Sequence, residues 1–179
     1  MQRTACGEES AFEILIERHQ SLVIGTIAKM LGDASTAEDL AQQVFIRVWQ
    51  SAPRYEASAK FTTWLLTITR NLVFNETRRR GRARLLPMEY DDGTPREFKD
   101  ASSPQPSMLL QSKELRTAID EAIASLPEQQ RLALILRRYE DMPYEDIAAV
   151  LKTTVPSVKS LLFRAREALR SQLERFLSL

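Results

Sequence analysis

The chain has 179 residues, of which 44% are apolar and 27% charged, with a net charge of +1 at pH 7. Its single cysteine, Cys6, excludes an intramolecular disulfide, and its single histidine, His19, excludes sites built on histidine pairs. No apolar run exceeds five residues, whereas a membrane-spanning helix needs about 20, and residues 1–10 lack the apolar core of a secretory signal, so we expect a soluble, cytoplasmic protein.

The N-terminal part of the chain has the apolar spacing of three helices. Capping boxes of the form S-x-x-E precede the first two, at residues 10–13 and 35–38. Gly32 is expected to break the first helix, and Pro53 to stop the second. The second helix shows one apolar and one polar face, which by itself indicates only an amphipathic helix.

The third helix is expected to begin near Phe61 and to end in a run of arginines, with Gly81 as its C-cap. Residues 68–86 hold six arginines and one acid. Aromatic rings, amides and a cationic tail suit single-stranded nucleic acid, because bases stack on rings while cations follow the phosphates. The alternative is that Trp64 is core and the arginines are a solvated helix end. Tyr55, in the loop before this helix, has less reason to be core.

Residues 85–111 have the composition of a linker. Four of the eight prolines lie between Pro87 and Pro106, and the acids in this stretch give it a net charge of −3. No helical or strand period runs through it. We expect one domain over residues 8–84 and a second over residues 112–175.

The C-terminal part predicts four helices. A capping box that contains Pro127 opens the second of them, and Pro143 follows its end. A short helix over 144–151, a turn at 152–154 and a longer helix from Val155 with basic outer positions are typical of a helix-turn-helix. No alternating run is long enough for a strand, so the predicted fold class is all-α.

The last of these helices has residue types suited to DNA at its N-terminal end. Thr154 can cap the helix, and Pro156 is tolerated in its first turn. A recognition helix enters the major groove by this end, where lysine or arginine reaches guanine. The outward or lateral residues there are Ser157, Lys159, Ser160, Phe163 and Arg164. The alternative is an ordinary helical hairpin with a solvated basic face.

Five segments occur in one order and spacing: AEDLAQQVFIRVWQ (37–50), RYEASAKFTTWLLTITRN (54–71), RRR (78–80), SLPEQQRLALILRRYEDMPYEDIAAVL (125–151) and VPSVKSLLFRARE (155–167). In this order they resemble a bacterial RNA polymerase sigma factor. The resemblance is to the compact extracytoplasmic-function (group 4) type, which keeps only the second and fourth conserved sigma domains. It extends over about residues 8–175 apart from the linker.

The resemblance implies a subunit that binds core RNA polymerase, directs it to promoters and assists their opening. For the second helix it implies docking on the β′ clamp helices by Asp39, Leu40, Gln42, Phe45 and Arg47. It implies recognition and melting of the −10 element by Tyr55, Phe61, Trp64, Asn71, Arg78, Arg79 and Arg80. It implies reading of the −35 element by Tyr144, Ser157, Lys159, Ser160, Phe163 and Arg164.

The partners implied are core RNA polymerase through its β′ clamp helices and β flap, promoter DNA and an anti-sigma factor. No enzymatic activity, small-molecule substrate, cofactor, metal or membrane insertion is implied. The acidic linker resembles the segment threaded through the polymerase. The sequence departs from the family pattern at Gln43, Lys152 and Leu161, where the family often has Glu, Gly and Arg.

Two rival functions follow from the residues themselves. A dimeric helix-turn-helix regulator acting without polymerase would require a sensor or dimerisation domain, but the N-terminal part has an aromatic loop and a basic helix. An all-helical enzyme would require a catalytic motif. His19, however, lies on an apolar stripe, and no glycine-rich phosphate loop or nucleophile motif is present.

Overall fold

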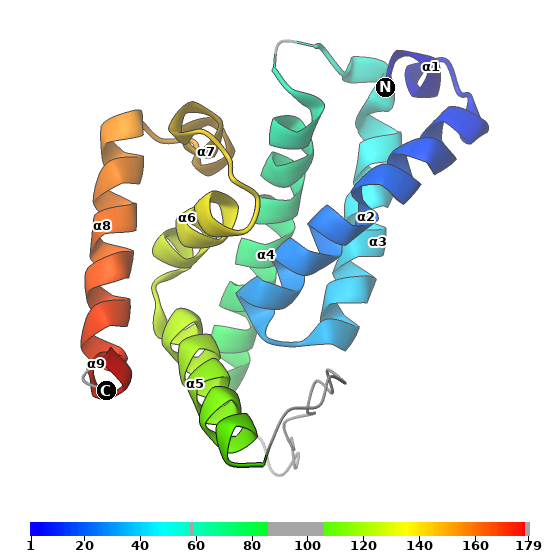
Figure 1. Cartoon of the computed structure of the whole chain (residues 1–179). Coiled ribbons are helices and arrows are strands. Elements are labelled where there is room, and N and C mark those ends of the chain that lie inside the picture. Colours follow the sequence, from blue (N-terminus) through cyan, green and yellow to red (C-terminus); the bar gives the residue numbers. More distant parts are fainter. Residues whose placement is uncertain (58, 86–105, 178–179) are drawn as a thin grey trace.

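The computed structural model describes residues 1–57, 59–85 and 106–177, and within these residues the chain is helical and has no strand (Figure 1). The longer helices are α2 (Glu9–Leu31), α3 (Ala34–Ser51), α4 (Phe61–Leu85), α5 (Pro106–Ser125), α6 (Glu128–Arg138), α7 (Tyr144–Leu151) and α8 (Val155–Gln172). The short ones are α1 (Gln2–Ala5), η1 (Ala52–Arg54) and α9 (Glu174–Leu177). The all-α prediction is confirmed. Most of the predicted linker lies outside the described residues, and α5 begins inside its predicted bounds.

No helix in the described ranges combines the length and the apolar character needed to cross a membrane.

The first two helices start at different residues from those predicted. The capping box at Ser10 is wrong, because the N-cap of α2 is Glu8, two residues earlier, and Glu8 makes no capping hydrogen bond. Asp33 rather than Ser35 caps α3: its carboxylate accepts hydrogen bonds from the amides of Ser35 and Thr36 at 3.1 and 3.3 Å. Gly32 ends α2 in the left-handed conformation with φ 70°, as predicted, and this turn leaves Asp33 extended and in reach of those amides.

Three other helix ends test the sequence rules. Gly81 is not a C-cap, since α4 continues through it to Leu85. Ser125 does not open α6; its hydroxyl donates to the carbonyl oxygen of Ala122 in the last turn of α5. Thr154 caps α8 as predicted, accepting a hydrogen bond from the amide of Ser157 at 3.4 Å.

The core has two halves, which we call the N-terminal unit (α2–α4) and the C-terminal unit (α5–α8). In the N-terminal unit the fully buried side chains include Val23, Ile27, Val44, Val48 and Leu65. In the C-terminal unit they include Ile135, Leu136, Ile147, Val158 and Leu162. Each buried aliphatic side chain contributes about 1.5–3 kcal/mol, so apolar burial is the main force that assembles both units.

The two units also pack on each other. Helix α4 lies between α2 and α3 on one side and α7 on the other (Figure 1). The end of α2 lies against α6. Buried residues of both units consequently belong to one continuous apolar cluster.

Candidate protein and nucleic-acid interfaces

The outer face of α3 is a polar surface with one large apolar side chain. Asp39, Gln42 and Arg47 are exposed, whereas Leu40 lies in the core. Ile46 is 54% exposed and projects from the same helix. Ile46 was not predicted as a surface residue; the signal in the sequence is an apolar residue outside the buried stripe of α3.

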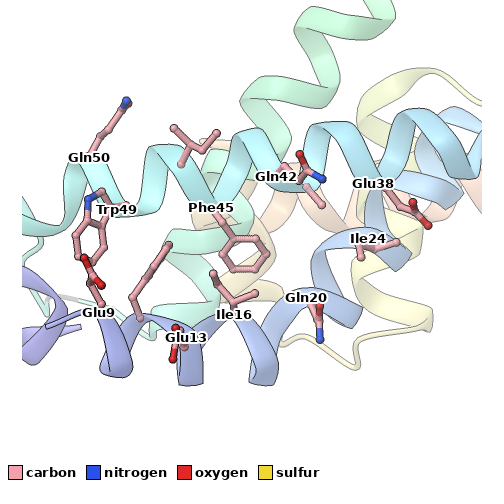
Figure 2. Close-up of a pocket in the computed structure, with 13 residues that line it drawn as sticks. Glu9, Glu13, Ile16, Gln20, Ile24, Glu38, Gln42, Phe45, Trp49 and Gln50 are labelled. Atoms are coloured by element: carbon pink, nitrogen blue, oxygen red, sulfur yellow. The ribbon is translucent and has the colours of Figure 1, made fainter.

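A groove of about 810 Å³ runs between α2 and α3 (Figure 2). Phe45 and Ile16 face each other across it, and Trp49 lies towards the α1 end, where its ring centroid is 5.0 Å from that of Phe12. The acids at its edge are Glu9, Glu13 and Glu38. Phe45 is 7% exposed and lines the floor of the groove, so the same side chain belongs to the core and to the groove. The α2 side of the groove was not predicted.

The aromatic residues before and at the start of α4 form a cluster. The ring of Tyr55 meets that of Trp64 edge-on, with 4.9 Å between centroids, and Phe61 lies 5.9 Å from Trp64. The ring of His19 packs against that of Phe61, with 5.0 Å between centroids. Partial burial, with a smaller effect of Arg18, lowers the pKa of His19. Three aromatic residues predicted to act on DNA are thus brought together and are all half-buried.

The amide of Asn71 is fixed by its neighbour. The Nη2 atom of Arg70 donates to the Oδ1 atom of Asn71 at 2.5 Å, and the Arg70 guanidinium also lies 5.8 Å from the centre of the Phe74 ring. Burial lowers the pKa of Arg70, and the charge of Arg78 adds to this effect. Asn71 is half-buried, and it lies seven residues, about two helical turns, before the exposed Arg78.

The arginine run at the end of α4 divides into two kinds of side chain. Arg80 donates from Nε to Glu76 at 2.9 Å, and from Nη2 to the hydroxyl of Thr36 at 2.7 Å and to Asp33 at 3.1 Å. Arg79 also pairs with Glu76, at 2.7 and 2.9 Å, but its side chain is 74% exposed. The hydrogen bond from Arg79 is the main cause that lowers the pKa of Glu76.

The position of the run relative to solvent follows from these contacts. Arg78 is exposed, and Arg79 is exposed despite its pairing. Arg80 holds the end of α4 to the turn between α2 and α3. The positive charge that this helix end presents to solvent is therefore carried by Arg78 and Arg79 rather than by Arg80.

The helix-turn-helix is present, formed by α7, a turn at 152–154 and α8. Lys152 occupies the left-handed position of the turn, with φ 54°, where the family pattern often has glycine. Its amide donates to the carbonyl oxygens of Ala148 and Ala149, which closes α7. This turn sets the direction of α8 relative to α7, which we call the support helix of the helix-turn-helix.

The N-terminal half of α8 presents an open surface. Phe163 is 65% exposed, the highest value among the exposed large hydrophobic side chains of the described residues. With Lys159, Ser160 and Arg164 it lines a shallow hollow of about 480 Å³. Ser157 is half-buried, and Tyr144 is half-buried beneath the guanidinium of Arg137, 5.5 Å from its ring centre. Five predicted residues thus share one end of α8, and Tyr144 lies at the start of its support helix.

Comparison with known proteins identifies both units. Residues 15–83 match the family model of sigma-70 region 2, and residues 116–169 match that of sigma-70 region 4. The RNA polymerase sigma-H factor of Pseudomonas aeruginosa is 34% identical over 183 residues, which cover 99% of this chain and 93% of that protein. The ECF RNA polymerase sigma-E factor of Escherichia coli K12 is 31% identical over 97% of this chain and 92% of its own length.

A solved structure agrees with the fold. The sigma factor RpoE from Bartonella quintana, in complex with the anti-sigma factor NepR, superposes with a TM-score of 0.68 at 24% identity, covering 92% of this chain and 97% of that one. Two matched regions in register, together with relatives over almost the whole length, go beyond what a helix-turn-helix alone indicates. The chain therefore belongs to the extracytoplasmic-function RNA polymerase sigma factors, the subunits that direct core polymerase to promoters.

Proposed function

We propose that this sigma factor divides its work among three surfaces: the α2–α3 groove with the outer face of α3 for polymerase, the aromatic cluster and α4 for the −10 element, and the N-terminal end of α8 for the −35 element. The observation that carries this assignment is the presence, in one chain, of an aromatic cluster beside a basic helix and an exposed recognition helix. The protein would then act without catalysis of its own and in the cytoplasm, where its polymerase is.

The α2–α3 groove suits a helical element of core polymerase such as the β′ clamp helices. Its apolar floor, formed around Phe45 and Trp49, offers area for burial, and the carboxylates of Glu13 and Glu38 favour a basic partner. Asp39, Gln42 and Arg47 extend this surface over the outer face of α3. Leu40 would contribute by holding α3 on the core rather than by touching the polymerase. The β flap is proposed to contact the C-terminal unit.

The aromatic cluster suits bases that have left the duplex. A stacked base gains about 1–3 kcal/mol, and Tyr55, Phe61 and Trp64 present ring edges and faces in one place. Asn71 supplies an amide, held by Arg70, for a base edge. Arg78 and Arg79 would contact phosphates, while Arg80 would support that surface through its ion pairs.

The N-terminal end of α8 suits the major groove of the −35 element. Lys159 and Arg164 are exposed cations that can reach guanine, and Phe163 can contact a thymine methyl group. The hydroxyl of Ser160 donates to the carbonyl oxygen of Pro156, so the Oγ atom of Ser160 is left to accept a hydrogen bond from DNA. Ser157 and Tyr144 lie where the two helices begin, near the expected phosphates.

An anti-sigma factor is the further partner that we propose. The RpoE structure of similar fold was solved with NepR, and the acidic, apolar groove of this chain offers a surface that such a protein could cover in competition with polymerase. A protein that co-purifies with the chain and is displaced by core polymerase would fit this role.

The test is in vitro transcription with core RNA polymerase, with and without this protein, on a fragment library from the source genome. New start sites with a shared pair of upstream elements are expected. If no new transcript appeared and core polymerase did not co-elute with the protein, the assignment would be wrong. A dimeric helix-turn-helix regulator would then be tested by footprinting the protein alone on duplex DNA.

A further inference from the structure

The aromatic cluster proposed for the −10 element receives a contact from a residue that was not predicted to act on DNA. The ring of His19 packs against that of Phe61, with 5.0 Å between centroids and 59° between the ring planes. Phe61 in turn lies 5.9 Å from Trp64 and 6.2 Å from Tyr55. These three residues belong to one short stretch of the chain, whereas His19 comes from a separate helix, α2. The contact therefore ties the cluster to a second element of the N-terminal unit.

The place of His19 on α2 is fixed by core packing. His19 follows Ile16 by three residues and precedes Val23 by four, so the three side chains lie on one face of the helix. Val23 is fully buried in the core, and α2 contacts α4. The imidazole is therefore attached to an element whose orientation the core determines, which is the kind of support that a precise site requires.

The ring of Phe61, in contrast, has little support from its own helix. Phe61 is the first residue of α4 and follows irregular backbone at residues 59–60. The amides of Thr63 and Trp64 donate to the carbonyl oxygen of Lys60 at 3.1 and 3.2 Å, which fixes the backbone of this first turn. Side chains on a helix lean towards its N-terminus and rest on the preceding turn, but the first residue has no such turn. The direction of the Phe61 ring therefore depends on side chains from elsewhere in the fold.

His19 is suited to packing against this ring as an uncharged group. Partial burial lowers the pKa of His19, and the charge of Arg18 has a smaller effect in the same direction. The imidazole is therefore largely uncharged at pH 7. The tilted arrangement of the His19 and Phe61 rings is one that aromatic pairs favour over a face-to-face stack. The contact thus adds a flat, neutral ring to the cluster without adding a charge.

The direction of the Phe61 ring matters because stacking depends on geometry. A binding site holds its groups to within about 0.5 Å of the productive arrangement, and a base gains stacking energy only where a ring is presented in the right direction. The planes of Phe61 and Trp64 are 39° apart, so a rotation of Phe61 would also change the surroundings of the indole. A residue that fixes Phe61 can therefore influence this DNA site without touching DNA.

We propose that His19 is a positioning residue of the −10 surface, and that its imidazole holds the ring of Phe61 against the other two rings of the aromatic cluster so that the cluster is ready for an unpaired base. The inference rests on the proposed function, because it is that function which assigns the cluster to melted DNA. The packing itself is a property of the free chain and is measurable without DNA or polymerase.

The first measurement is the fluorescence of Trp64 in the free chain. The protein has two tryptophans, so Trp49→Phe leaves Trp64 as the single one. In this background His19→Leu, which keeps an apolar side chain but removes the ring, should shift the emission to longer wavelength, because looser packing admits water to the indole. His19→Phe supplies a ring again and should keep the original emission.

The second measurement is promoter opening by the holoenzyme, with Trp49 retained, read as permanganate reactivity of thymines in the −10 region. His19→Leu should lower opening roughly five- to tenfold, the scale on which the loss of one stacked base acts. Binding to core polymerase and discrimination of −35 sequences should stay unchanged. His19→Phe should restore opening. In a Phe61→Leu background His19→Leu should cause no further loss, because the proposed effect passes through the Phe61 ring.

The matched control is Ile27→Val, which removes one methyl group from a fully buried side chain about two turns farther along α2. It lowers stability but should leave the Trp64 emission and promoter opening unchanged. An unchanged emission in His19→Leu would overturn the proposal, as would a failure of His19→Phe to restore opening or an equal effect of Ile27→Val. An additive loss in the double variant with Phe61→Leu would show that His19 acts by another route.

Failure of the proposed function would look different. If the wild-type protein gave no transcripts and no reactive thymines with core polymerase, the assignment of the cluster to the −10 element would be wrong, whatever the emission showed. If Phe61→Leu lowered opening and His19→Leu did not, that assignment would stand and the role given to His19 would be wrong.

Discussion

The two surfaces proposed for DNA differ in how far their residues are already engaged within the protein. In the N-terminal unit Tyr55 and Trp64 are packed together and Asn71 is held by Arg70. In the C-terminal unit Phe163 is 65% exposed and extends from α8 into solvent. Unpaired bases need a shaped site that is assembled in advance, whereas a duplex groove has its own shape and is read by side chains on a rigid helix. Substitutions should therefore affect stability and DNA binding together in the first unit and separately in the second.

The largest effect is expected from a pair of aromatic substitutions, one in each unit. Trp64→Ala should lower the free energy of unfolding by about 2–3 kcal/mol, because it removes a half-buried ring from the cluster with Tyr55 and Phe61, and it should abolish promoter opening. Phe163→Ala should leave stability within about 0.5 kcal/mol and weaken −35 binding. Urea unfolding and permanganate footprinting measure the two properties. Equal losses of stability in both variants would remove the distinction between the surfaces.

Removal of a cation from α8 should cost about 1–3 kcal/mol in discrimination of the −35 sequence if the contact is a bidentate one to a base. Lys159→Ala and Arg164→Ala test this, since both side chains line the hollow beside Phe163. Arg166→Ala, an exposed arginine farther along the same helix, is the control. The measurement is transcription by the holoenzyme from promoters with intact and altered −35 elements. A loss that is the same for both promoters would place these side chains on phosphates instead.

The units should also respond to acid with opposite signs. Hydrogen bonds from Arg79 and Arg80 lower the pKa of Glu76 from its ordinary 4.5, so its stabilising contribution is present above pH 4.5 and is lost as the pH falls through the lowered value. Glu76→Gln should cost about 1–2 kcal/mol at pH 7 and should flatten the acid dependence. Burial raises the pKa of Glu140 in the C-terminal unit, so Glu140→Gln should instead stabilise the protein at pH 7. Urea unfolding at pH 7, 5 and 4 measures the free energy of unfolding of both variants. A change of the same sign at pH 7 for Glu76→Gln and Glu140→Gln would contradict the opposite pKa shifts of these two groups.

The smallest effect is expected at two helix C-caps in the left-handed conformation, those of α2 and α7. The N-terminal unit has glycine there, Gly32 at φ 70°, whereas the C-terminal unit has Lys152 at φ 54°. Lys152→Gly should raise the free energy of unfolding by about 0.5–1 kcal/mol, because glycine adopts this conformation without steric strain. Gly32→Ala should lower it by about 1 kcal/mol. Thermal unfolding of the two variants checks the opposite signs, and stabilisation by both would show that backbone strain does not decide these positions.

Local patterns in the sequence were enough to predict most helices. The periodic apolar residues of α3 and α8, the stop at Pro53 and the cap at Thr154 depend on neighbours a few positions away, and the structure confirms them. Errors arose where two local signals competed. Asp33 rather than Ser35 caps α3, because the left-handed Gly32 places the carboxylate of Asp33 beside the free amides at the start of the helix. Helix α4 continues through Gly81, and Glu76 in its last turns pairs with Arg79 and Arg80.

The site was predictable only in part, for a different reason. The residues of α8 were located correctly on one exposed end because a single helix brings them together. The groove required Ile16 of α2 to meet Phe45 of α3, and the contact of Lys60 with Asp146 joins residues 86 positions apart. Such pairs are fixed by how helices dock, for which neither residue carries a local signal.

The carboxylate of Asp33 has a consequence for how the sigma factor holds its two kinds of surface together. One oxygen starts α3, the helix proposed to face polymerase, and the other receives Arg80 from α4, the helix proposed to face DNA. The angle between α3 and α4 therefore depends on a single side chain that contacts both helices. A substitution of Asp33 would therefore change how the melted DNA is oriented relative to the polymerase, although Asp33 itself would contact neither.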